Sequence, residues 1–101
     1  MIHHSVVFKL KHATGSRSEI EFLQAAQKLA NIPVVNNFKC LHQISKKNNF
    51  DFGLSMEFAS PDDYQTYNDH PDHIYFVENR WIPEVIDFME IDYEPYSVER
   101  R

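Results

Sequence analysis

The feature that most constrains the fold of this chain is an alternation of apolar and polar side chains in well-separated stretches. It is clearest in FDFGLSMEF (50–58), where a large apolar residue occupies every second position, and IHHSVVFKL (2–10) alternates in the same way. Successive side chains of a β-strand point to opposite faces, so this pattern predicts two strands with one buried face each. FKCLHQI (38–44) and VIDFMEIDYEP (85–95) are predicted as two more strands.

Two helical segments are predicted between these strands. SRSE (16–19) is typical of a capping box, in which serine and glutamate satisfy free N–H groups at a helix start. Apolar residues then recur at helical spacing from Ile20 to Ala30, before NIPVVNN ends the helix. The second helix is predicted to begin with Ser60 as its N-cap and Pro61 in its first position, and to run to about Asp69. Pro71 breaks it and can start another turn of helix through DHIYFVENRW (72–81).

The predicted order is therefore β-α-β-β-α-β, and 101 residues allow one domain. This order is typical of an α+β, ferredoxin-like protomer, with a four-stranded antiparallel sheet and helices on one face. We expect residues 1–97 to form that single domain and residues 98–101 to be a polar C-terminal tail.

The uncovered face of such a sheet is predicted to be apolar. The alternation places on it Val7, Leu41 and some of Met89, Ile91 and Tyr93. A large exposed apolar patch on a small domain usually marks an interface. The sequence therefore predicts a homodimer whose two copies pack sheet on sheet about a two-fold axis.

Composition argues against several classes of function. The net charge is −5 and no basic run exceeds two residues, which argues against nucleic-acid binding. With only two glycines, the chain has neither a P-loop nor a dinucleotide fingerprint, and no cofactor is predicted. Cys40 has no second cysteine to pair with. Neither an apolar run of ~18 residues nor a signal peptide is seen, so we expect a cytoplasmic protein without a membrane span.

Four stretches resemble the stress-responsive dimeric A/B barrel (Dabb) family, in register from about residue 2 to 95. They are HHSVVFKLK, NNFDFGLSMEF, YNDHPDH and IDYEP, and the spacing Y..HP.H is the most specific. The resemblance implies a ferredoxin-like protomer whose two sheets close into a barrel in a dimer, with the helices outside.

The motif also resembles that of a branch similar to olivetolic acid cyclase, which closes polyketide chains without a cofactor. Matched by position, this resemblance implies that Tyr67 and His73 carry the chemistry. It also implies that His4 and His70 belong to the substrate cavity, and that Phe52 occupies the place of a cavity histidine of the cyclase.

The residues themselves leave three interpretations of His70 and His73: a metal pair, a structural turn, or acid/base chemistry. Pro71 disfavours one continuous helix, because the residue before a proline is driven out of the helical region, and no metal site is predicted. His73 has a side chain that can exchange a proton near neutral pH, and the Tyr67 hydroxyl could donate to an enolate oxygen. His4 is either a core histidine bonded to a backbone group or a polar group on a pocket wall.

Two functions follow as hypotheses, and the sequence does not decide whether the protein is an enzyme. The first is a stress-response A/B barrel homodimer that binds a small apolar or polyketide-like molecule between sheet and helices, without catalysis. The alternative is a cofactor-free cyclase or lyase, with His73 as general base and Tyr67 as oxyanion donor.

Overall fold

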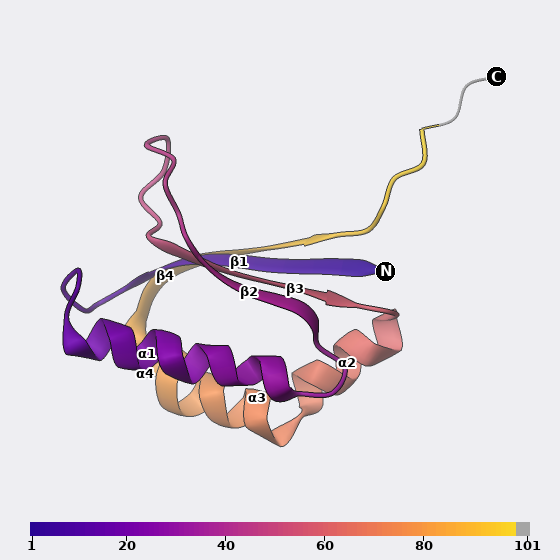
Figure 1. Ribbon diagram of the computed structural model, residues 1–101, viewed down its shortest axis with the longest axis horizontal. Helices are drawn as coiled ribbons and strands as arrows, with labels where there is room; N and C mark the ends of the chain where they lie inside the picture. The colour runs from indigo at the N-terminus through magenta and orange to yellow at the C-terminus, as the bar shows by residue number, and fades with distance from the viewer. Residues whose placement is uncertain (99–101) are drawn as a thin grey trace.

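The computed structural model describes residues 1–98 and has the predicted order of elements (Figure 1). The strands are β1 (Ile2–Leu10), β2 (Asn36–His42), β3 (Phe52–Phe58) and β4 (Val85–Tyr93). The helices are α1 (Arg17–Gln27), the 3-10 turn η1 (Lys28–Asn31), α2 (Pro61–Asp69), α3 (Pro71–Phe76), the π-helical turn η2 (Val77–Trp81) and α4 (Ile82–Glu84). Of the predicted tail 98–101, residues 99–101 lie outside the described part of the chain.

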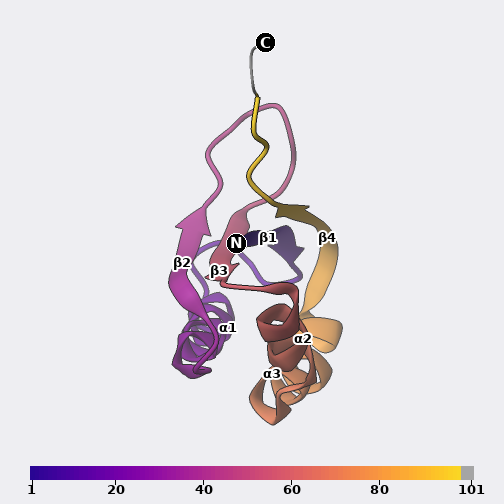
Figure 2. The ribbon, with the colours of Figure 1, turned by 90° about the vertical axis from the view of Figure 1, so that its right-hand side faces the viewer.

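The four strands form one antiparallel sheet in the order β2-β3-β1-β4. The helices lie on one face of this sheet and leave the other face uncovered (Figures 1 and 2). The predicted ferredoxin-like α+β fold is therefore confirmed. No helix within residues 1–98 is long and apolar enough to cross a membrane.

The core lies between the sheet and the helices. Every second residue of β1 from His4 to Leu10 is buried, as the alternation predicted. Phe8 is fully buried and its ring centroid lies 5.7 Å from that of Phe22 on α1 and 5.0 Å from that of Trp81 on η2. Burying each such ring contributes on the order of 2 kcal/mol, so this aromatic cluster fixes both helical segments on the sheet.

Helix α1 packs on the sheet with one side of the broad apolar face predicted between Ile20 and Ala30. Its buried residues are Phe22 and Ala26, and Leu29 of η1 continues the row, whereas Ile20 is 49% exposed. The stripe that packs inward is the one that brings the large Phe22 ring over Phe8.

The uncovered face carries a row of apolar side chains that we call the open-face band: Val7, Leu41, Met89, Ile91 and Tyr93. Leu41, Met89 and Tyr93 are about half exposed, at 47%, 48% and 58%. The strand register places Leu41 beside Gly53, Gly53 beside Val7, and Val7 beside Met89, so the band crosses all four strands. The exposed apolar face expected from the alternation is present.

Candidate functional site

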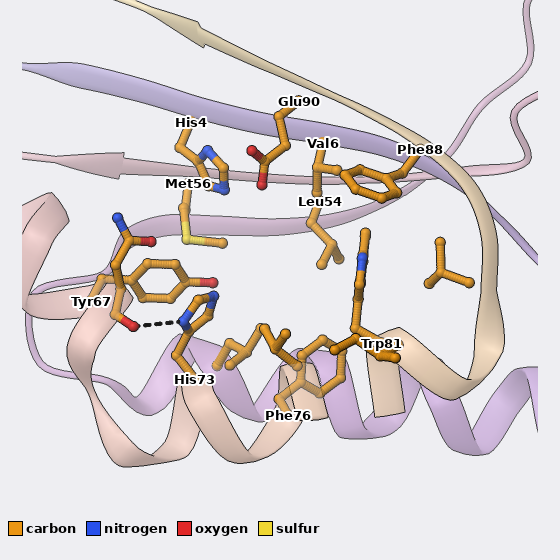
Figure 3. Close-up of a pocket in the computed structure, with 15 residues that line it drawn as sticks. His4, Val6, Leu54, Met56, Tyr67, His73, Phe76, Trp81, Phe88 and Glu90 are labelled. Carbon is orange, nitrogen blue, oxygen red and sulfur yellow. Dashed lines mark hydrogen bonds between the residues drawn. The ribbon is translucent and has the colours of Figure 1, made fainter. Parts of the chain in front are cut away.

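A cavity of about 550 Å³ lies between the helix-covered face of the sheet and the segment from α2 to η2 (Figure 3). Its polar end is formed by His4, Tyr67, Asn68, His73 and Glu90. The rest of its wall is mainly apolar and includes Val6, Leu54, Phe76, Trp81 and Phe88. Pockets that bind small molecules typically measure ~300–1,000 Å³ and combine apolar walls with a few polar groups.

The polar end depends on a break between two helices. Helix α2 ends at Asp69, and Pro71 occupies the first turn of α3. His70, between them, has extended backbone, and its ring nitrogen Nδ1 accepts the N–H of Asp72 at 3.1 Å. His70 therefore caps α3, and the helix is interrupted before Pro71 as the sequence predicted. The change of direction brings His73 back toward Tyr67.

His73 has a fixed tautomer. Its Nδ1 lies 3.1 Å from the carbonyl oxygen of Asn68, which only accepts hydrogen bonds, so Nδ1 carries the proton. The other ring nitrogen, Nε2, is left as an acceptor on the cavity side (Figure 3). Burial lowers the pKa of His73 from its usual value, and the hydrogen bond to the Asn68 carbonyl opposes this effect only in part. The ring is therefore held neutral.

Tyr67 lies beside His73, with 4.3 Å between the two ring centroids. The side chain comes from α2, is almost fully buried, and directs its hydroxyl into the cavity (Figure 3). Burial, and secondarily the charge of Glu90, raise the pKa of Tyr67. The hydroxyl therefore stays protonated and is a hydrogen-bond donor next to an accepting imidazole nitrogen.

His4 is anchored by a carboxylate from the other end of the chain. It is 6% exposed, and its Nδ1 donates to Asp92 Oδ1 at 2.6 Å. The Tyr64 hydroxyl donates to Asp92 Oδ2 at 2.8 Å and lies 2.9 Å from the same His4 nitrogen. Burial and the bond to Asp92 raise the pKa of Tyr64. His4 thus lines the cavity, and its partner is a side chain rather than a backbone group.

The structure brings three of the five residues singled out in the sequence to one cavity and leaves two outside it. His4, Tyr67 and His73 line the cavity, whereas His70 and Phe52 do not. His70 is engaged as a helix cap. The Phe52 ring packs against Phe8 and His42, with centroids 5.9 and 5.8 Å away, so it is not placed to touch a ligand in this cavity.

Three polar residues at or beside the cavity were not singled out in the sequence: Tyr64, Glu90 and Asp92. Glu90 and Asp92 lie opposite Val6 and His4 in the β1–β4 register, so they face the helices. A period-two count along β4 would have placed both on the face of Phe88. Among residues 1–98, no group of three or more His, Cys, Asp or Glu side chains is arranged to hold a metal ion.

Comparisons with known proteins agree with this architecture. The family model described as Stress responsive A/B Barrel Domain matches residues 2–95. A stress-response A/B barrel domain-containing protein of Arabidopsis thaliana is 30% identical over 95 residues, which are 92% of this chain. This chain spans only 36% of the length of that relative.

Two solved structures with a ferredoxin-like fold are similar to this chain. A Dabb family protein with a ferredoxin-like fold from Mesorhizobium loti is 52% identical, with a TM-score of 0.92 over 95% of this chain and 97% of that one. A dimeric ferredoxin-like protein of unknown function from Thermobifida fusca is 23% identical, with a TM-score of 0.76 over 91% of this chain and 88% of that one. The second similarity concerns the fold alone.

Proposed function

This chain belongs to the stress-responsive A/B barrel domain family, and from that premise we propose that it is a homodimer that binds a small molecule in the cavity between sheet and helices. The observation that carries the proposal is the cavity of about 550 Å³, apolar along most of its wall and polar at one end. His4, Tyr67 and His73 supply hydrogen-bonding groups there, which would orient a ligand whose apolar part fills the remainder.

The homodimer is supported by the open-face band. Val7, Leu41, Met89, Ile91 and Tyr93 form an apolar surface that no helix or strand within residues 1–98 covers. A sheet face of this kind is self-complementary in a two-fold arrangement. The Thermobifida fusca protein of the same fold is dimeric. Light scattering should give twice the 12.0 kDa mass of one chain, and a mass of one chain at micromolar concentration would contradict the proposal.

Ligand binding is tested by a thermal-shift screen of small amphipathic molecules against the wild type and His73→Ala. A compound that raises the melting temperature of the wild type and not of the variant would identify a ligand of the polar end. The exposed residue His42, which lies outside the cavity, provides the matched control as His42→Ala. Compounds that shift all three proteins equally would show binding elsewhere.

A second candidate function is supported by the protonation of Tyr67 and His73. The lowered pKa of His73 keeps a neutral base in the cavity, and the raised pKa of Tyr67 keeps a donor beside it. In a cofactor-free lyase or cyclase of the kind that olivetolic acid cyclase represents, His73 Nε2 would remove a proton α to a carbonyl. Tyr67 would donate to the enolate oxygen, and His73 would return the proton afterwards.

This candidate has a test that needs no knowledge of the natural substrate. Removal and return of an α-proton exchanges it for deuterium in D₂O, and NMR follows the loss of the α-proton signal of an alkyl phenyl ketone. Exchange should be faster with the wild type than with His73→Ala or Tyr67→Phe. Equal exchange with all three proteins would contradict the enzymatic role.

A further inference from the structure

Glu90 places an unpaired carboxylate at the polar end of the cavity. It lies on β4 directly opposite Val6 of β1, and its side chain points in toward the space between His4 and Val6 (Figure 3). Within residues 1–98, no cation forms an ion pair with it. The nearby Asp92 carboxylate, in contrast, is engaged by His4 and Tyr64.

A second group at this end accepts hydrogen bonds as well. The Nδ1–H of His73 is used by the Asn68 carbonyl, so the Nε2 of its neutral ring accepts. Glu90 adds two accepting oxygens. The Tyr67 hydroxyl and the Asn68 side-chain amide are donors at this end. A ligand that satisfies Glu90 and the Nε2 of His73 must bring donors of its own.

The apolar remainder of the cavity determines what kind of body the ligand can have. Leu54, Phe76, Trp81 and Phe88 line it and offer no charge. The ring centroids of Trp81 and Phe88 are 5.6 Å apart in an edge-to-face arrangement, so this end is an aromatic wall. A flat or aliphatic body fits such a wall by apolar burial.

We propose that the cavity takes an amphipathic molecule with an apolar body and a hydrogen-bond-donating head, a hydroxyl or an ammonium group, and that Glu90 excludes carboxylates. An ammonium brings three donors and a charge opposite to that of Glu90. A carboxylate brings only acceptors and a like charge, which costs binding energy at short range. This inference rests on the proposed small-molecule function of the same cavity and specifies its ligand class.

Three probes share a phenylalkyl body and differ in their head group, so they measure the effect of the head group alone. They are 4-phenylbutylamine, 4-phenyl-1-butanol and 4-phenylbutyrate. Trp81 is the only tryptophan of the chain and lies in the cavity, so its fluorescence reports occupancy. The full-length protein is titrated at neutral pH as wild type, Glu90→Gln and Glu78→Gln. Glu78 is exposed on η2 outside the cavity lining, so its substitution changes the net charge equally without changing the cavity.

In the wild type, the amine and the alcohol should bind more tightly than the carboxylate. Glu90→Gln should lower the ratio of amine to carboxylate affinity by roughly fivefold, the effect of about 1 kcal/mol from a partly exposed charge. Glu78→Gln should leave the ratio within about twofold of the wild type, because a screened, distant charge contributes little.

The other outcomes distinguish a failure of the selection by Glu90 from a failure of ligand binding itself. Equal affinities for the three heads, a preference for the carboxylate, or equal ratios in both variants would overturn the selection by Glu90 while ligand binding stands. If no probe changes Trp81 fluorescence or the melting temperature, the small-molecule function of the cavity fails, and this inference fails with it. If Glu90→Gln does not fold, the order of the three probe affinities in the wild type is measured at low and high salt instead. A preference for the amine over the carboxylate that salt weakens would support selection by charge, and a preference that salt leaves unchanged would contradict it.

Discussion

His4 and His73 present the same ring nitrogen to the cavity, although different atoms hold them. A carboxylate, Asp92, accepts the Nδ1–H of His4, and a backbone carbonyl, that of Asn68, accepts the Nδ1–H of His73. In both cases the bond at Nδ1 fixes the direction of the ring, and for His73 it also fixes the tautomer. The two anchors come from opposite sides of the cavity, the sheet and the helices, so a ligand held between them contacts both layers.

The lowered pKa of His73 predicts a pH effect on stability. Between this lowered pKa and the usual value of about 6.5, the unfolded state binds a proton that the folded state does not. The titration of His73 therefore leaves the free energy of unfolding unchanged above that window and lowers it as the pH falls through the window. His73→Gln keeps an amide donor for Asn68 but has no titrating group, so it should lose less stability than the wild type between neutral and mildly acidic pH.

Urea unfolding of both proteins across this pH range measures the effect. The other titratable groups around the ring, His4, His70 and Glu90, are present in both proteins and largely cancel in the difference. Parallel curves of unfolding free energy against pH would show that the surroundings of His73 do not disfavour its charged form.

Tyr64 offers a second test at the level of one atom. Tyr64→Phe removes the hydroxyl that donates to Asp92 and keeps the ring, which stacks on Phe58 with centroids 4.9 Å apart. We expect the free energy of unfolding to fall by about 1 kcal/mol, because the bond has a charged acceptor but is partly exposed. Tyr75→Phe, at a tyrosine that is 68% exposed, should change it little. A similar change in both variants would mean that the bond to Asp92 contributes nothing.

Residues of the site differ in how far the sequence reveals them. Tyr67 and His73 stand in one short motif, so a local pattern can identify both. The partner of His4 is 88 residues away along the chain, and its identity depends on the register of β1 on β4. Register follows from packing of the whole sheet, which no local pattern reports. Alternation along β4 can place Asp92 and Glu90 on the helix-facing side of the sheet, but only the fold shows which residues they face.

Among the elements, α2 carries Tyr67 and depends on its first turn. The Ser60 hydroxyl accepts the N–H of Asp63 at 3.1 Å. Ser60→Ala removes this cap and should lower the free energy of unfolding by about 1 kcal/mol, measured in urea. Ser18→Ala, within α1 and exposed, should be neutral or slightly stabilising because alanine favours helix. Equal effects of the two substitutions would show that the cap is dispensable.

Elements with a local signal were predicted, and those set by packing were not. Alternation located β1 and β3, and the Ser60 cap and Pro71 located the ends of α2. Helix was expected from Pro71 through Trp81, but the π-helical form of Val77–Trp81 was not. Such a turn has no strong sequence signature and arises where packing requires a wider turn. Here it places the Trp81 ring 5.0 Å from that of Phe8, between core and cavity.

At the scale of the whole molecule, the open-face band predicts which substitution should weaken dimerisation. Leu41→Lys places a charge on that band, where it would be buried between two sheets, and should weaken association by more than about tenfold. Ile20→Lys is the matched control, because Ile20 is 49% exposed on the outer side of α1 and Leu41 is 47% exposed. Light scattering over a dilution series measures both. Association that Leu41→Lys leaves intact would place the interface elsewhere.

The cavity and the open-face band lie on opposite faces of the same sheet. A dimer built through the band would therefore contain two separate chambers, each lined by residues of one protomer and divided from the other by both sheets. Nothing would need to be shared between them. Saturation should follow a simple hyperbola at two ligands per dimer, with a Hill coefficient of about 1. Dimerisation would then assemble the two protomers without coupling ligand binding in one chamber to ligand binding in the other.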